Sequence, residues 1–267
     1  MALVQIQNLT KEFSSGEGWL SNGKVRQVTV VDNVSFTIEA GETLGLVGQS
    51  GCGKTTLGRM ILRLIEPTSG SVHFNGQDVL AANGREMRRL RRDMQIVFQD
   101  PVGSLDPRMR IFEIITEPLV IHRESSASGG HSVPQQAAEL MRAVGLDESA
   151  LQRYPHEFSG GQRQRIGIAR ALALKPKFIV ADEPVSALDV SVGAQIINLL
   201  AKLQREFGLT YLFISHSMPI VRYLSTRIAV MHAGKIVELG SAEQVTQNPA
   251  HPFTRSLLEA TPEIQAL

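Results

Sequence analysis

Apolar and polar residues alternate in two stretches near the start of the chain, a period typical of half-buried strands. Val4 and Ile6 belong to the first stretch, and the second carries Val28, Val30, Val34, Phe36 and Ile38. We therefore predict two antiparallel strands. The Gly- and Ser-rich segment between them, residues 14–24, is predicted to be a loop.

Short continuous apolar runs, by contrast, predict strands that are buried on both faces, as in parallel sheets. They occupy residues 44–47, 178–181 and 211–214. A helical pattern over residues 190–207 joins the last two runs, which predicts a βαβ crossover. Residues 228–231 and 236–239, linked through Ala233-Gly234, predict a hairpin.

Helical periodicity also covers residues 111–120, 135–144 and 159–174, which suggests a small helical subdomain. Residues 122–134 have almost no apolar content, so we expect an exposed, mobile loop there. A short helix over residues 253–260 is predicted near the end of the chain. The order of elements predicts an α/β fold class.

Composition narrows the function classes. The 267 residues fit one large α/β domain, and a net charge of +1 gives no bulk argument for nucleic acid. The single cysteine, Cys52, excludes an internal disulfide and any all-cysteine metal or iron–sulfur site. The first residues lack the basic stretch followed by an apolar run that marks a signal peptide. No apolar run approaches the ~20 residues that span a bilayer. We expect any action at a membrane to pass through partners.

The run from residue 48 to residue 56 reads Gly-Gln-Ser-Gly-Cys-Gly-Lys-Thr-Thr and fits Gly-x-x-x-x-Gly-Lys-Ser/Thr in full. It follows a predicted strand and precedes a predicted helix, so a glycine-rich turn with a coincidental lysine is a poor alternative. Lys54 should reach the β- and γ-phosphates, and the Thr55 hydroxyl should bind Mg²⁺. The candidate nucleotide-binding residues are Gly48, Ser50, Gly51, Cys52, Gly53, Lys54, Thr55 and Thr56.

Two carboxylates, Asp182 and Glu183, end the apolar run at residues 178–181. The carboxyl edge of a parallel sheet is where ligands bind, so we expect Asp182 to hold the Mg²⁺ shell there. Glu183 is predicted to polarise the attacking water, as general base or as water-positioner. Acidic residues at strand ends are also common surface features, and the phosphate loop is what favours the functional interpretation.

Ser159, Gly160, Gly161 and Gln162 open a predicted helix and make a second anion-binding N-terminus. A protein with one complete phosphate loop has no evident need of another, so this motif can serve the nucleotide of a second subunit. A helix N-cap at Ser159 is the plainer alternative, and the two are compatible.

Gln99 and His216 each end an apolar strand, on the edge expected to face nucleotide. Taken alone, a strand-end glutamine or histidine is more often structural than catalytic.

These elements, in this order, resemble the ATP-binding cassette ATPases over nearly the whole chain. Gly48 to Thr56 is similar to Walker A, Gln99 to the Q-loop, Ser159 to Gln162 to the signature, and Asp182-Glu183 to the end of Walker B. Residues 186–189 are similar to the D-loop and His216 to the switch histidine. Phe13 stands where the family has the aromatic that stacks on adenine.

The resemblance implies a P-loop NTPase fold with a parallel sheet, an antiparallel β subdomain and a helical signature subdomain. It divides one ATPase domain over residues 1–267 into a core with the antiparallel subdomain at about 1–98 and 175–240, a helical subdomain at about 100–174, and an extension at about 241–267. It implies ATP and Mg²⁺, with Glu183, His216 and Gln99 catalytic and Thr55, Gln99 and Asp182 around the metal.

The family also implies a head-to-tail pair of such domains, with ATP held between one partner's Walker A and the other's signature. Residues 154–165 and 248–254 resemble the dipeptide, oligopeptide and nickel importer branch. That branch implies a second ATPase, usually a different chain with a homodimer as the alternative, two permease subunits and a solute-binding protein. The predicted location is peripheral, on the cytoplasmic face of the plasma membrane. The branch's iron–sulfur cluster is not expected, because its C-terminal cysteines are absent.

Some positions depart from the family. Phe158 precedes the signature in place of leucine, and Ser217 follows His216 where many relatives have Asp. The transported solute stays open among peptide, nickel and other small solutes, with peptide favoured.

A basic run, Arg85 to Arg92, suits a solvated helix face or a partner contact better than nucleic acid, given the net charge. Two other hypotheses compete with an importer ATPase. One is a non-transport cassette acting in DNA repair or translation. The other is a regulatory module without turnover, which the presence of Glu183 and Lys54 argues against.

Overall fold

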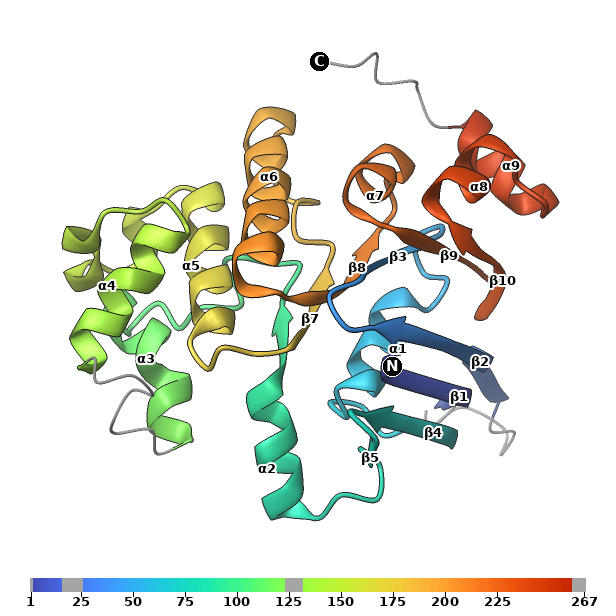
Figure 1. Cartoon of the computed structure of the whole chain (residues 1–267), viewed down its shortest axis with the longest axis horizontal. Coiled ribbons are helices and arrows are strands. Elements are labelled where there is room, and N and C mark those ends of the chain that lie inside the picture. Colours follow the sequence, from blue (N-terminus) through green and yellow to red (C-terminus); the bar gives the residue numbers. More distant parts are fainter. Residues whose placement is uncertain (1, 16–25, 123–131, 261–267) are drawn as a thin grey trace, which may run out of the picture. The chain divides into compact units, whose positions relative to one another are not determined.

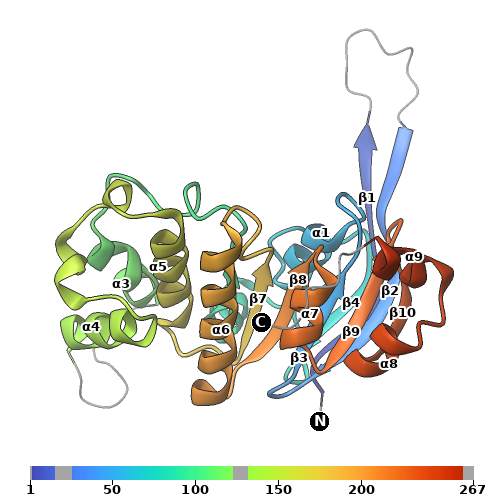
Figure 2. The same cartoon turned by 90° about the horizontal axis from the view of Figure 1, so that it is seen from above.

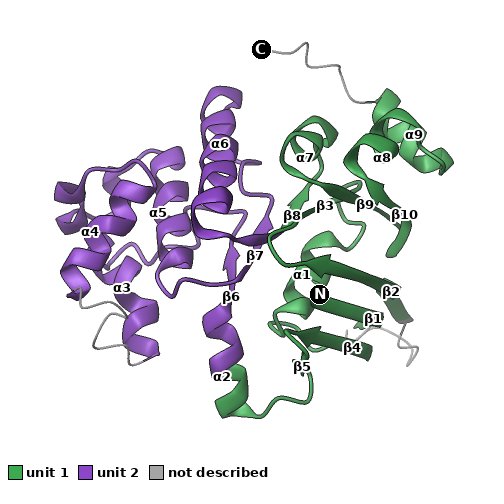
Figure 3. Cartoon of the chain, in the orientation of Figure 1, with its two compact units in different colours: residues 1–87, 212–267 green, residues 88–211 purple. Residues whose placement is uncertain are grey.

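The computed structural model describes residues 2–15, 26–122 and 132–260. These residues form two compact units (Figure 3). Unit 1 comprises residues 1–87 and 212–267, and unit 2 comprises residues 88–211.

Unit 1 contains an antiparallel sheet with the strand order β2-β1-β4-β5 (Figure 1). The strands are β1 (Ala2–Ser15), β2 (Arg26–Glu39), β4 (Ser69–Phe74) and β5 (Gln77–Asp78). The predicted pairing of the first two strands is confirmed, with Val4 opposite Ile38 and Ile6 opposite Phe36. Ser14 and Ser15 lie in β1, whereas the rest of the expected loop up to residue 24 falls outside the described residues.

A second group of strands in unit 1 has the order β10-β9-β3-β8. These are β3 (Thr43–Val47), β8 (Thr210–Ser215, of which residues 212–215 belong to this unit), β9 (Arg227–His232) and β10 (Lys235–Ser241). Strands β3 and β9 are parallel, and β9 and β10 form the predicted hairpin. Every residue of β3 and β8 is buried, because apolar side chains on both faces are covered.

Among the described residues, four helices lie wholly in unit 1, and Figure 2 shows α8 and α9 beside β10. They are α1 (Lys54–Ile61), α7 (Met218–Leu224), α8 (Ala242–Gln247) and α9 (Pro252–Glu259). Helix α1 follows the phosphate loop as predicted. Helix α7 buries Met218, Val221 and Leu224, which recur every three residues along one face.

Unit 2 pairs two parallel strands, with Met94 opposite Phe178. They are β6 (Met94–Val97) and β7 (Phe178–Asp182). Its helices are α3 (Ile111–Ile121), α4 (Val133–Ala143), α5 (Gly160–Leu172) and α6 (Val190–Phe207), with two 3₁₀ turns, Glu148–Gln152 and Pro155–Glu157. Helix α2 (Gly84–Asp93) begins in unit 1 and ends in unit 2, and it carries the basic run as a helix.

The loop expected over residues 122–134 ends earlier than predicted. Helix α4 begins at Val133 because Ser132 and Gln135 form a capping box and Pro134 lies in the first turn. Residues 123–131 fall outside the described part of the chain.

Over the described ranges, none of the helices has the length and apolar character needed to cross a membrane.

Candidate nucleotide-binding site

The phosphate loop (residues 48–56) leads from buried β3 into α1, both within unit 1. Gly53 is the N-cap of α1, with a left-handed φ of 109°, and no side chain caps the helix. Gly51 also has a positive φ, of 80°. Glycine adopts this region without the strain that a Cβ brings, so the chain can curl here and direct backbone N–H groups toward an anion.

Close packing, as well as backbone conformation, requires glycine in this loop. A Cβ on Gly48 would overlap the carbonyl oxygen of Met231 and lie 2.9 Å from Cys52 Sγ. A Cβ on Gly53 would lie 2.5 Å from the carbonyl oxygen of Val30. Real Cβ atoms do not come so close to backbone oxygens, so both positions exclude alanine without local movement.

The ammonium group of Lys54 is buried, with a residue exposure of 4%. Its Nζ donates to the carbonyl oxygens of Gly48 at 2.8 Å and Gln49 at 3.0 Å. The loop's own backbone therefore holds this charge at the centre of the loop. Cys52 Sγ lies 3.9 Å from the same ammonium, and burial raises the pKa of the thiol although Lys54 opposes the rise. Cys52 is thus a packed, protonated neighbour of Lys54 at neutral pH.

Phe13 lies near the end of β1 and is 41% exposed. The Nζ of Lys11 sits 5.0 Å from the centre of its ring. Lys11 is held there because it donates to the carbonyl oxygen of Glu66 at 2.7 Å.

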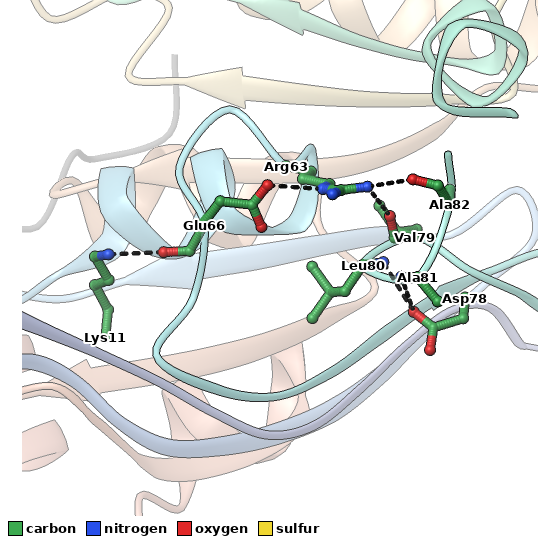
Figure 4. Close-up of polar contacts among 8 residues, drawn as sticks. All are labelled: Lys11, Arg63, Glu66, Asp78, Val79, Leu80, Ala81 and Ala82. Carbon is green, nitrogen blue, oxygen red and sulfur yellow. Dashed lines mark hydrogen bonds and ion pairs between the residues drawn. The ribbon is translucent and has the colours of Figure 1, made fainter. Parts of the chain in front are cut away.

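Figure 4 shows how Glu66 is fixed in turn, just beyond the end of α1. Its Oε1 accepts from Arg63 Nε at 2.9 Å, and Arg63 Nη1 donates to the carbonyl oxygens of Val79 and Ala82 at 3.2 and 2.6 Å. This network connects the C-terminal end of α1 to Lys11, and so to the position of Phe13.

Asp182 and Glu183 lie at the end of β7 in unit 2, where the sequence predicted them. Asp182 is 2% exposed and Glu183 is half-buried. Glu183 has a positive φ of 45°, which costs a non-glycine residue about 1–2 kcal/mol. Ser186 fixes the turn that follows, since its N–H and hydroxyl donate to the Glu183 carbonyl oxygen at 3.2 and 3.1 Å. Such strain is typical of functional positions.

The signature residues begin α5, also in unit 2. Ser159 and Gln162 form a capping box, in which Ser159 Oγ accepts from the Gln162 N–H at 3.4 Å and Gln162 Oε1 accepts from the Ser159 N–H at 3.0 Å. A Cβ on Gly161 would overlap Val192 of α6, and one on Gly160 would lie 3.2 Å from Leu188. The N-cap interpretation of Ser159 is confirmed, and the glycines let α5 approach α6 closely.

The segment that resembles the D-loop ends at Asp189, the N-cap of α6. Its Oδ1 accepts from the Val192 N–H at 2.9 Å and from the Ser191 hydroxyl at 2.7 Å. The hydrogen bond from Val192 and that from Ser191 hold the pKa of Asp189 below its ordinary value. This carboxylate therefore fixes the start of α6 beside the signature glycines.

Gln99 and His216 are both exposed, Gln99 after β6 in unit 2 and His216 after β8 in unit 1. Each stands at a strand end, as the sequence predicted. Next to Gln99, the carbonyl oxygen of Phe98 accepts from Gln164 Nε2 of α5 at 3.4 Å. This bond connects the backbone of the Q-loop position to the helix that carries the signature.

The candidate residues therefore fall into two sets. Unit 1 holds the phosphate loop, Phe13 and His216, and unit 2 holds Gln99, the two carboxylates and the signature. Over the described residues, no three His, Cys, Asp or Glu side chains are grouped as metal ligands. Sequence reasoning missed Met231 and Val192, which pack against Gly48 and Gly161. The glycines themselves were the only sequence signal for these close approaches.

Comparison with known proteins places the chain in a family. A family described as ABC transporter matches residues 31–186. The chain belongs to the ABC transporter family. It is 51% identical to the oligopeptide transport ATP-binding protein OppF of Streptococcus mutans over 98% of its own length and 82% of that protein. It is 52% identical to OppF of Bacillus subtilis over 97% of this chain and 82% of that protein.

Another family relative is the glutathione import ATP-binding protein GsiA of Pectobacterium atrosepticum. It is 50% identical over 97% of this chain and 41% of that protein. Among solved structures, the ATP-binding cassette MJ0796 in a dimeric post-hydrolysis state bound to ADP and Pi matches with a TM-score of 0.77 and 32% identity. The match covers 90% of this chain and 98% of that one. The predicted cassette ATPase fold is confirmed.

Proposed function

We propose that this chain is the ATP-binding and ATP-hydrolysing subunit of an importer for peptides. The observation that carries the proposal is the identity of about half of all positions, over nearly the full chain, to ATP-binding proteins of oligopeptide transport. The alternative role in DNA repair or translation has no support among these relatives.

The phosphate loop fits the triphosphate and Mg²⁺. The N-cap of α1 is Gly53, which has no side chain to cap the helix, and the N-terminus of a helix attracts anions. Lys54 supplies a buried positive charge, and Gly48 and Gly53 occupy positions where a Cβ would meet backbone oxygens. We assign phosphate binding to the backbone of residues 48–56 and to Lys54, and adenine stacking to Phe13.

By the resemblance, the Thr55 hydroxyl, Asp182 and Gln99 would hold Mg²⁺, which would neutralise charge at the phosphates. Glu183 would accept a proton from the attacking water or orient it, and Ser186 holds the backbone turn at this residue. His216 is assigned a catalytic role, as its resemblance to the switch histidine implies. These roles follow the resemblance residue by residue.

The signature has a role in this proposal only if a second cassette is present. The N–H groups at the start of α5 would face the nucleotide held by the partner's phosphate loop. The matched MJ0796 structures are dimeric, which supports such a pair. For this branch we expect the partner to be a different ATPase chain. A second copy of this chain is the alternative.

Two permease subunits and a solute-binding protein complete the proposed importer, with this chain peripheral on the cytoplasmic face of the plasma membrane. The proposal is tested by reconstituting the chain with its permeases in proteoliposomes. ATP inside the vesicles should drive accumulation of a labelled oligopeptide delivered by the binding protein. Recovery of the chain with ribosomes or DNA, and no uptake, would refute the importer.

A further inference from the structure

The turn between β9 and β10, formed by Ala233 and Gly234, contacts the backbone of the phosphate loop. The Gly234 N–H donates to the Cys52 carbonyl oxygen at 3.1 Å. The Gly234 carbonyl oxygen accepts from the Asp32 N–H of β2 at 2.9 Å. Ala233 and Gly234 both have positive φ, of 45° and 83°, as in the tight turns that fit hairpin twist. One rigid turn is therefore hydrogen-bonded to the phosphate loop and to β2.

The hairpin packs directly against two glycines of the loop. A Cβ on Gly48 would overlap the Met231 carbonyl oxygen, and a Cβ on Gly53 would lie 2.9 Å from Met231 Cε. Close-packed backbone has no free space to absorb a shift, so a displacement of the hairpin would displace the loop.

The C-terminal segment contacts the same hairpin beside the turn and along β10. His232, the last residue of β9, meets the ring of Phe253 in α9, with ring centres 3.9 Å apart and an interplanar angle of 30°. Glu238 of β10 accepts from the backbone N–H groups of Ala250 at 2.8 Å and His251 at 3.0 Å. His251 Nδ1 also caps α9 by accepting from the Phe253 N–H at 3.1 Å.

Hydrogen bonds from Arg255 also hold the C-terminal segment together. Arg255 donates from Nε to the Pro249 carbonyl oxygen at 3.1 Å and from Nη2 to the Ala250 carbonyl oxygen at 3.2 Å. Residues 249–255 thus form a compact unit around the start of α9 that contacts the hairpin at Phe253 and at Glu238. Figures 1 and 2 both show α9 beside β10.

We infer that Phe253 and Glu238 are positioning residues for nucleotide binding. The C-terminal segment keeps the β9–β10 turn in the place that the phosphate loop needs to bind phosphates. This inference rests on the proposed nucleotide site and adds a dependence of that site on α9. In physical terms, loosening the segment lowers the fraction of molecules with a competent loop, and the apparent dissociation constant rises in inverse proportion.

A plainer alternative is that the C-terminal segment only covers the hairpin and has no effect on nucleotide binding. It predicts lower stability for a Phe253 variant and unchanged nucleotide affinity. An aromatic pair of this kind is worth about 0.5–1.5 kcal/mol, which corresponds to a factor of about 2–12 in an equilibrium constant. The two interpretations therefore differ by a measurable amount.

The test measures ADP binding to the full chain by calorimetry, together with thermal unfolding without nucleotide. Phe253→Ala should raise the Kd for ADP at least ~3-fold, whereas Phe253→Tyr, which keeps the ring, should bind as the wild type does. Phe207→Ala is the control, because it removes a half-exposed ring at the end of α6, in unit 2. It should leave the Kd unchanged.

A double-mutant cycle keeps the test independent of folding losses. His232→Ala should weaken ADP binding as Phe253→Ala does, and the double variant should be no weaker than either single one. Glu238→Gln should also weaken binding. Normal ADP binding by Phe253→Ala, or simple additivity in the cycle, would overturn the inference. Failure of the wild-type chain to bind ADP would instead overturn the proposed function.

Discussion

The close approach of α5 to α6 at the signature makes a quantitative prediction. A Cβ on Gly161 would overlap Val192 Cγ1, whereas its distance to Val192 Cβ would be 3.7 Å, within ordinary contact. Gly161→Ala therefore overpacks the site, at a cost of about 1–3 kcal/mol, partly offset by about 0.5–1 kcal/mol from alanine in a helix. Val192→Ala alone costs about 1 kcal/mol, because it removes methyl groups from a half-buried side chain.

The double variant should recover most of the free energy of unfolding that Gly161→Ala loses, since Val192→Ala removes the Cγ1 atom that the new Cβ would overlap. The expected coupling energy is about 1–3 kcal/mol in favour of the pair. Urea unfolding of the wild type and the three variants, followed by circular dichroism, measures it. Additivity within about 0.5 kcal/mol would refute the packing argument. ATP hydrolysis by the assembled pair should fall in Gly161→Ala and return in the double variant, because the start of α5 regains its place.

The remaining predictions concern unit 1. Lys54→Ala should weaken ATP binding and hydrolysis, measured by calorimetry and phosphate release, because it removes the buried charge; normal affinity would count against the phosphate-loop assignment. Gly48→Ala should raise the Kd for ADP about tenfold, since the Cβ overlaps a backbone oxygen, whereas Gly84→Ala meets nothing within 4 Å and should be neutral. An equal change in Kd for Gly48→Ala and Gly84→Ala would refute the close approach of Met231 to Gly48. Burial raises the pKa of Glu238, but the hydrogen bonds it accepts outweigh this, so its pKa lies below 4.5. Its contribution to stability is present above pH 4.5 and is lost as pH falls through the folded-state pKa. The Tm difference between wild type and Glu238→Gln should therefore shrink as pH falls from neutral through the folded-state pKa, and a constant difference would contradict the assignment.

Elements with a strong period were predicted from sequence, because the pattern reflects which faces are buried. Helix α6 begins and ends at the predicted residues, and the β9–β10 hairpin forms around the predicted Ala233-Gly234 turn. Strand β4 was not predicted. It has apolar residues only at Val72 and Phe74, and it contains Gly70 with a φ of 97°. Its pairing with β1 makes it a strand, and pairing partners cannot be read from a local pattern.

The phosphate loop and its flanking strand and helix were predictable because one short motif specifies a complete local geometry. The contacts around that motif were not. Met231 packs against Gly48 from a position 183 residues later in the chain, which is a property of the fold and not of any window of sequence. The start of α4 was missed even though the signal was present, since Ser132 and Gln135 have capping-box spacing.

The central claim is that the chain hydrolyses ATP with Glu183 acting on water in a paired site. Phosphate release by wild type and Glu183→Gln, together with size-exclusion chromatography in ATP, tests it most directly. The account predicts turnover lower by at least ~10²-fold in Glu183→Gln and an ATP-bound dimer that persists. Unchanged hydrolysis by Glu183→Gln, or a variant that stays monomeric with ATP bound, would contradict it.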